Sequence, residues 1–224
     1  MRPAAVPRTG IGILGGTFNP PHLGHRALAR HALRELSLER VLLMPARLPP
    51  HKSTAEDPGA PRRLEMCRLL LDGTPGLGVS ALELDRDGPS YTVDTLRVLH
   101  ATHPATSLTF VLGADIARTL PTWHQPRELL ALARLAVALR AGSSTTAVRA
   151  ELAGLLDDDT LEGRVRFLNM PAFDVSSSLV RARAQRGEPV AELVGPAVAE
   201  YIATCGLYRA PLAGASAPSA TGAA

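Results

Sequence analysis

Two histidines, His22 and His25, lie three positions apart at the start of a predicted helix, directly after the segment Gly15 to Pro21. The i, i+3 spacing places both imidazole rings on one face of that helix. The apolar run from Ile11 to Leu14 predicts a buried parallel strand before the glycines. Backbone N–H groups, the positive end of the helix dipole and both rings then converge on one anion, so the sequence predicts a phosphate site.

The residues beside the histidines fit a nucleotide. Asn19 is predicted to cap the helix, and Pro20 and Pro21 to fill its first turn, where a missing N–H costs nothing. Gly24 lets a base or ribose lie against the backbone. The segment matches neither G-x-x-x-x-G-K-[ST] nor G-x-G-x-x-G. The alternative is an ordinary strand-to-helix turn with two surface histidines, and the second histidine favours the phosphate site.

A second candidate phosphate site comes late in the chain. Ser176, Ser177 and Ser178 precede another predicted helix, and Arg181 follows Ser178 by one turn. Serine hydroxyls and free amides at a helix start bind phosphate, and a guanidinium forks onto phosphate oxygens. A serine-capped helix with a solvated arginine is the alternative. The presence of the histidine pair favours the phosphate site here as well.

Weaker signals point to sugar and acceptor binding. Gly113 permits close approach after a predicted strand, and Asp115 either accepts ribose hydroxyls or caps the next helix. Tyr91 and Thr92 open a helix whose positive end suits a carboxylate. Trp123, the only tryptophan, either stacks on an aromatic ring of the acceptor or packs in the core.

These motifs resemble a known family. The segment Gly15 to His25 is similar to the H-x-G-H signature of the nucleotidylyltransferase superfamily, in the G-G-T-F-[DN]-P-P-H-x-G-H form of nicotinate-nucleotide adenylyltransferases. Val175 to Arg181 resembles I-S-S-T-x-x-R, with serine replacing threonine at 178. Pro49 to Lys52, Ser90 to Thr95, Gly113 to Asp115 and Trp123 follow the family's order, so the resemblance spans about residues 11 to 208.

The resemblance implies adenylyl transfer from ATP to nicotinate mononucleotide, with Mg²⁺ accompanying the ATP. It implies catalytic roles for His22, His25 and Arg181. The implied ATP-binding residues are Gly15, Gly16, Thr17, Phe18, Gly24, Gly113, Asp115, Ser176, Ser177 and Ser178. The implied acceptor-binding residues are Lys52, Tyr91, Thr92, Trp123 and Arg140, and no residue is expected to be a metal ligand.

Composition narrows the function class. The 224 residues carry a formal net charge of only +3, with the two signs interspersed, so nothing demands a nucleic-acid partner. Lys52 is the only lysine among 24 basic residues. Either this position requires an ammonium group, or the single lysine is a coincidence of the composition. Two cysteines are too few for a disulfide framework. No apolar run is long enough to cross a bilayer, and we expect a cytoplasmic protein without a membrane partner.

The fold class expected is α/β, with a Rossmann-like, doubly wound, mostly parallel sheet and helices on both faces. Three parts are predicted: an extension over residues 1–10, one nucleotidylyltransferase domain over 11–208, and a disordered tail over 209–224. The predicted strands cover residues 11–14, 40–44, 78–82, 108–112, 135–139 and 164–168. The predicted helices cover 22–36, 61–71, 92–101, 127–132, 147–156, 178–186 and 196–204, and residues 46–61 form a long loop.

Other functions remain open at this point. A sibling transferase acting on nicotinamide mononucleotide or another phosphorylated acceptor shares the same histidine chemistry. A nucleotide-binding regulator without turnover comes from a different class, and the intact set of His22, His25, Ser177 and Arg181 argues against it. The sequence leaves the oligomeric state undetermined.

Overall fold

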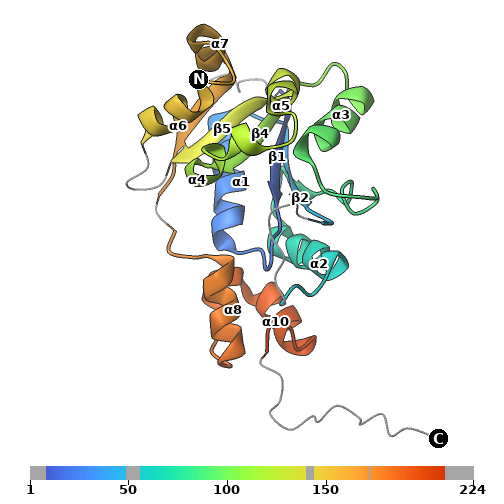
Figure 1. Ribbon diagram of the computed structural model, residues 1–224. Coiled ribbons are helices and arrows are strands. Elements are labelled where there is room, and N and C mark those ends of the chain that lie inside the picture. Colours follow the sequence, from blue (N-terminus) through green and yellow to red (C-terminus); the bar gives the residue numbers. More distant parts are fainter. Residues whose placement is uncertain (1–8, 49–55, 140–143, 172, 210–224) are drawn as a thin grey trace, which may run out of the picture.

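The computed structural model describes residues 9–48, 56–139, 144–171 and 173–209. Lys52, Arg140, most of the expected N-terminal extension and nearly all of the expected tail therefore lie outside the described residues. The described chain forms one six-stranded sheet in the order β3-β2-β1-β4-β5-β6, with every neighbouring pair parallel (Figure 1). The strands are β1 (Ile11–Gly16), β2 (Arg40–Pro45), β3 (Leu77–Val79), β4 (Leu108–Gly113), β5 (Arg134–Leu139) and β6 (Val165–Asn169).

Helices connect the strands. They are α1 (Leu23–Glu35), α2 (Ala60–Leu71), α3 (Thr92–Thr102), α4 (Ala114–Ala117), the 3₁₀ turn η1 (Leu120–Thr122), α5 (Pro126–Leu132), α6 (Thr145–Leu152), α7 (Asp158–Arg164), α8 (Ser177–Gln185), α9 (Ala191–Val194) and α10 (Pro196–Thr204). The strand order and the helical crossovers are those of a doubly wound Rossmann-like fold, so the predicted fold class is confirmed.

The sheet is buried on both faces, as its apolar strands predict. One face, with Leu14, Val41 and Val111, packs against α1, α2, α8 and α10. The other, with Ile13 and Phe110, packs against α3, α5 and α6. Successive residues of one strand therefore pack into the cores on opposite faces of the sheet, and this alternation fixes the register of each strand.

Several predicted elements need correction. The strand expected over 78–82 ends at Val79, and the helix expected over 147–156 spans Thr145–Leu152, because Ser144 caps its start. Helix α1 begins at Leu23 with His22 as its N-cap, so Asn19 is not the cap and Pro20 and Pro21 precede the helix. The short helices α4, α7 and α9 and the turn η1 were not predicted, because three to seven residues carry too little periodicity.

The strand order creates a switch point between β1 and β4. The connections from these two neighbouring strands leave toward opposite faces of the sheet, which opens a crevice at their carboxyl ends. Helices α8 and α10 lie beyond the carboxyl end of β1 (Figure 1). The first histidine motif follows β1 and the Gly113 motif follows β4, so the fold brings both to this crevice.

Candidate active site

The turn after β1 is shaped by close contacts between glycine and aromatic rings. A Cβ atom at Gly16 would lie 3.1 Å from the Phe18 ring, and one at Gly15 would lie 3.1 Å from the ring of Phe110. Phe18 is only 3 % exposed and has a φ of +52°, which a non-glycine residue rarely adopts. The two glycines therefore let the rings cover the backbone, and a buried phenylalanine holds the turn in an unusual conformation.

The two histidines stack on each other at the start of α1. Their ring centroids are 3.6 Å apart with 25° between the planes, which confirms the shared face predicted from the spacing. A Cβ at Gly24 would lie 3.0 Å from Val175 and 3.1 Å from Nδ1 of His22. Gly24 is thus explained by the packing of the histidine ring and Val175, a reason that differs from the predicted contact with a nucleotide.

A hydrogen bond orients the second histidine. The backbone N–H of His22 donates to Nδ1 of His25 at 3.1 Å, so this ring nitrogen acts as an acceptor. In a neutral imidazole the proton then resides on Nε2, as assigned from this bond. The T-shaped contact with Phe18, at 4.9 Å between centroids, supports the same ring. His25 is therefore held in one ring orientation, with Nδ1 accepting the backbone N–H and the proton of the neutral ring on Nε2.

Helix α8 joins the second motif to the first. Ser176 is its N-cap and accepts from the N–H of Leu179 at 3.1 Å, as the serine-rich start predicts. The hydroxyl of Ser177 donates to the carbonyl of Pro20 at 2.8 Å, across 157 residues of sequence. The two motifs thus form one site, and the Ser177 hydroxyl serves as a tie between them.

Arg181 makes three contacts through its guanidinium. Nη1 donates to the carbonyl of Asn19 at 2.7 Å, and Nη2 lies 3.4 Å from the hydroxyl of Ser178. Nε pairs with the carboxylate of Glu56 at 2.8 Å. The side chain is 16 % exposed, so it is not the solvated arginine of the alternative interpretation. Its donors lie beside the turn that carries the histidines.

The expected acceptor side is built around the start of α3. Tyr91 is the N-cap of this helix and its ring packs on His124 in a tilted arrangement, with 4.4 Å between centroids and 32° between the planes. Trp123 meets Phe110 edge to face at 6.0 Å and donates from Nε1 to Thr119. Because Phe110 also contacts the backbone at Gly15, these aromatic side chains border the turn after β1.

A buried carboxyl group supports the first turn of α3. Glu83 is 6 % exposed and accepts from the hydroxyl of Thr95 at 2.7 Å. Burial raises the pKa of Glu83 above its ordinary value, an effect opposed by hydrogen bonds from Thr95 and Ser90 and by the charge of Arg86. Ser90 in turn accepts from the backbone N–H of Arg47, which links α3 to the loop after β2.

The Gly113 motif lies at the neighbouring strand end. Gly113 closes β4 and is the N-cap of the short helix α4, so Asp115 lies in the first turn and is not the cap. A Cβ at Gly113 would meet nothing within 4 Å, so no protein contact requires glycine there. Asp115 is exposed and its role in ribose binding stays a prediction.

Comparisons with known proteins decide the family. A family model described as cytidylyltransferase-like matches residues 13–183. A relative from Geobacillus thermodenitrificans is 38 % identical over 200 residues, which cover 89 % of this chain and 86 % of the relative. A relative from Albidiferax ferrireducens is 42 % identical over 199 residues, covering 89 % and 98 %. Both carry the name "Probable nicotinate-nucleotide adenylyltransferase".

This chain belongs to the nicotinate-nucleotide adenylyltransferase family. Solved structures of Plasmodium falciparum nicotinic acid mononucleotide adenylyltransferase share its fold. The complex with APC has a TM-score of 0.69 at 16 % identity, and the complex with NaAD has 0.71 at 18 %; each alignment covers 90 % of this chain and 98 % of the other. The family resemblance drawn from the two motifs is confirmed.

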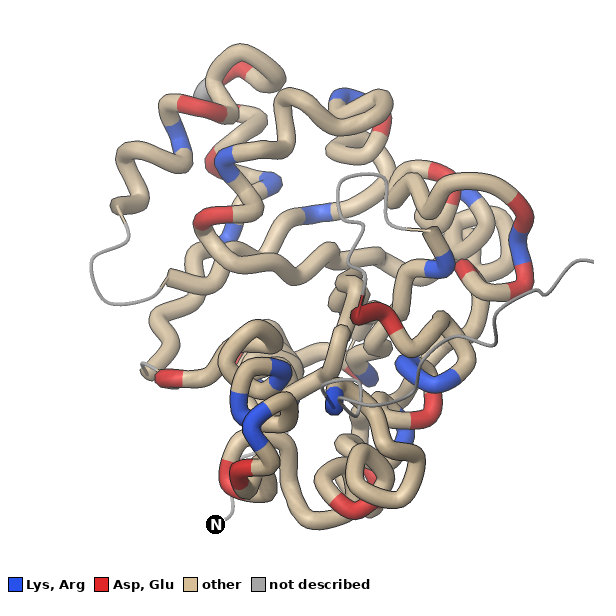
Figure 2. Tube along the Cα trace, turned by 60° about the horizontal axis from the view of Figure 1, so that its bottom comes forward, with Lys and Arg blue, Asp and Glu red and all other residues tan. Residues whose placement is uncertain are grey.

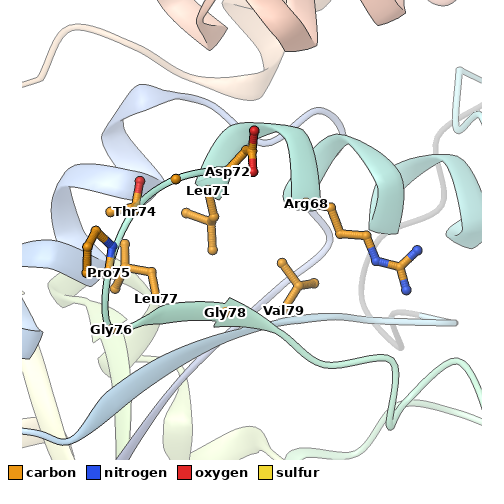
Figure 3. Close-up of a pocket in the computed structure, with 10 residues that line it drawn as sticks. Arg68, Leu71, Asp72, Thr74, Pro75, Gly76, Leu77, Gly78 and Val79 are labelled. Carbon is orange, nitrogen blue, oxygen red and sulfur yellow. The ribbon is translucent and has the colours of Figure 1, made fainter.

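One hollow in the surface of this family member lies outside the crevice. An open hollow of about 590 Å³ lies between the end of α2 and β3, lined by Leu71, Leu77 and Val79 among others (Figure 3). The turn before β3 is at the amino ends of the strands, and the hollow contains none of the proposed site residues. Blue and red segments are both spread over the described chain (Figure 2), which agrees with the interspersed charge of the sequence. Within the described residues, no helix is long and apolar enough to span a membrane.

Four side chains at this site of the transferase were not singled out from the sequence. Glu56 pairs with Arg181, Arg63 binds the carbonyl of Thr17, Glu83 supports α3, and the His124 ring packs on Tyr91. Only Glu83 gave any signal, as a charged residue between two leucines, a pattern that predicts a buried and compensated charge.

Proposed function

We propose that this chain transfers the adenylyl group of ATP to nicotinate mononucleotide, releasing pyrophosphate and forming nicotinate adenine dinucleotide. The names of relatives at 38 % and 42 % identity over nearly the whole chain support this activity. The observation that carries this proposal is the direct contact between the histidine motif and the serine-arginine motif. Ser177 and Arg181 of α8 bind the turn that leads to the stacked histidines, at the switch point of the sheet.

The proposed reaction needs no nucleophile from the protein. A phosphate oxygen of the mononucleotide forms the new bond to the α-phosphorus of ATP, and the bond from that phosphorus to the bridging oxygen breaks as pyrophosphate leaves. The protein contributes alignment and stabilisation of the charge that develops on the leaving group. His25, through Nε2–H, and Arg181, through its guanidinium, are proposed to supply those donors, with His22 beside them.

The remaining nucleotide contacts are proposed from position. We propose that the backbone of Gly16 to Phe18 bridges the ATP and acceptor sides, and that Ser176 and Ser178 at the start of α8 bind ATP. Gly113 and Asp115 are proposed to contact the ribose of the adenylyl group.

Mg²⁺ is proposed to enter with the ATP. Within the described residues, no group of three or more His, Cys, Asp or Glu is placed to hold a metal ion. Mg²⁺ commonly binds substrate phosphates with few protein ligands, which fits a site whose side chains are chiefly cations and hydroxyls. When bound, the ion neutralises triphosphate charge, and the protein donors bind the remaining oxygens.

The acceptor is proposed to bind at the start of α3. The N–H groups after Tyr91, including that of Thr92, suit the carboxylate of nicotinate, and the Trp123 ring suits its pyridine. Lys52 and Arg140 remain proposed acceptor contacts from the sequence and lie outside the described residues. We also propose a cytoplasmic location, since the curated relatives are bacterial enzymes of nucleotide metabolism by name.

The test is turnover on paired acceptors. Purified protein is incubated with ATP, Mg²⁺ and either nicotinate or nicotinamide mononucleotide, and pyrophosphate release is measured. We expect kcat/KM to be at least about tenfold higher for the acid, because a helix N-terminus prefers a carboxylate to an amide. Higher kcat/KM for the amide would assign the sibling activity. ATP binding without pyrophosphate release on either acceptor would favour the regulator instead.

A further inference from the structure

Arg63 is a fully buried cation that binds the active-site turn. It lies on α2 with 1 % of its side chain exposed. Nη1 donates to the carbonyl of Thr17 at 2.7 Å, Nη2 to the carbonyl of Arg47 at 3.3 Å, and Nε to the carboxylate of Asp57 at 2.9 Å. One guanidinium therefore joins the turn after β1, the loop after β2 and the segment before α2.

The chemistry of these contacts requires arginine. A buried charge is costly unless it is paired and its donors are satisfied, and here one carboxylate and two carbonyls do so. A planar guanidinium presents donors in several fixed directions, whereas an ammonium is a single mobile point. Lysine at position 63 keeps the charge but has no geometry that serves three separated acceptors.

The bond to Thr17 also fixes the direction of an N–H group. The carbonyl of Thr17 and the N–H of Phe18 belong to the same planar trans peptide, so they point in opposite directions. Because the carbonyl is directed at Arg63, the N–H of Phe18 is directed away from it. Phe18 has a φ of +52° and its ring packs on His25, so rotation of this peptide alters the turn beside the catalytic histidine.

We propose that Arg63 is a positioning residue for adenylyl transfer, which directs the Phe18 N–H and the turn beneath His25 toward the reacting phosphates. Asp57 fixes the plane of the guanidinium in this arrangement. The inference rests on the proposed function and deepens it, because it assigns the orientation of the bridging backbone to a side chain that contacts no substrate.

The experiment compares Arg63→Lys with Arg68→Lys. Arg68 lies on the same helix, is 58 % exposed and pairs with Glu65, so it is a matched control. For each variant, kcat, both KM values and the melting temperature are measured with the acceptor that the wild type uses. We expect Arg63→Lys to lower kcat at least tenfold with both KM values within threefold, while the protein stays folded at the assay temperature. Arg68→Lys should remain within twofold of wild type in every constant.

A purely structural role for Arg63 predicts a different result. The melting temperature of Arg63→Lys would fall while kcat per folded molecule stayed within twofold of wild type, and this outcome overturns the proposal. If Arg63→Lys does not fold, Asp57→Ala decides, because the guanidinium remains but its plane is no longer fixed. A kcat at least threefold lower supports the proposal, and an unchanged kcat overturns it. Wild-type turnover is measured first, so an inactive wild type counts against the proposed function and not against Arg63.

Discussion

The carboxylate of Glu56 binds the guanidinium of Arg181, with 2.8 Å between Oε2 and Nε. Gln185, one turn further along α8, donates to the other carboxylate oxygen at 2.6 Å. The carboxylate therefore occupies an edge of Arg181 that the triphosphate is proposed to use. A bound anion and a protein carboxylate compete for the same donors, so we expect ATP to displace Glu56 from Arg181.

Replacing Glu56 by Gln should strengthen ATP binding. The neutral amide competes less well for Arg181, and the pair is partly exposed, so we expect the KM for ATP to fall by about threefold, on the order of 0.6 kcal/mol. Steady-state kinetics with ATP varied measures the effect. Glu65→Gln is the control, because Glu65 is an exposed glutamate paired with Arg68 on α2. An unchanged or raised KM in Glu56→Gln would mean that the carboxylate does not compete with ATP.

Two substitutions separate the capping and catalytic roles of His25. Asparagine retains an acceptor near the position of Nδ1 for the His22 N–H but lacks the Nε2–H donor. Glutamine places its amide near the position of Nε2 but does not accept the hydrogen bond from the His22 N–H. We expect His25→Asn to lose about a hundredfold or more in kcat with stability preserved, and His25→Gln to lose about 1 kcal/mol of stability and less activity.

Turnover and urea unfolding of both His25 variants provide the measurement. Equal kcat values in the two variants would contradict the assignment of the catalytic donor to Nε2. If His25 were only structural, His25→Gln would lose more stability than His25→Asn, and neither variant would lose turnover per folded molecule.

Arg181→Lys should impair ATP use although the charge is kept. Three separate acceptors share the guanidinium, whereas the donors of a lysine all lie on one nitrogen and cannot reach the same three positions. We expect kcat/KM for ATP to fall by about tenfold or more, near 1.4 kcal/mol. Arg183→Lys is the control on the same helix, since Arg183 pairs with Glu192. Constants within about twofold of wild type would make Arg181 a surface arginine.

The buried Glu83 predicts a pH-dependent stability. Its pKa in the folded protein is raised above the ordinary 4.5, so the folded state binds the proton more tightly than the unfolded state. The contribution of Glu83 to stability is therefore fully present below about pH 4.5 and is lost as the pH rises through the folded pKa.

Unfolding of wild type and Glu83→Gln between pH 4 and 8 tests this sign. We expect the stability of the glutamine variant, relative to wild type, to increase with pH and then level off once Glu83 is ionised in both states. A difference that is constant across the range would show that the pKa of Glu83 is the same in the folded and unfolded protein.

Local sequence determined the strands, the main helices and the chemistry of the two motifs. Apolar runs such as Leu108 to Leu112 predict buried strands because each residue of a parallel strand faces a core. The spacing of His22 and His25 fixed a shared helix face, and the structure confirms the stacked pair. Serine before α8 capped it as expected, because capping depends on residues within one turn. The start of α1 was wrong, since the cap is a histidine rather than Asn19.

Tertiary structure alone decided which groups hold those motifs. Ser177 meets Pro20 across 157 residues, Arg181 meets Glu56 across 125, and Arg63 meets Thr17 across 46. Periodicity and capping report only neighbours along the chain, whereas these contacts depend on strand order and on how helices cross the sheet. The guanidinium of Arg63 donates to the backbone carbonyls of Thr17 and Arg47. These acceptors could not be recognised in the sequence, because every residue has a backbone carbonyl and only the fold decides which one faces the arginine.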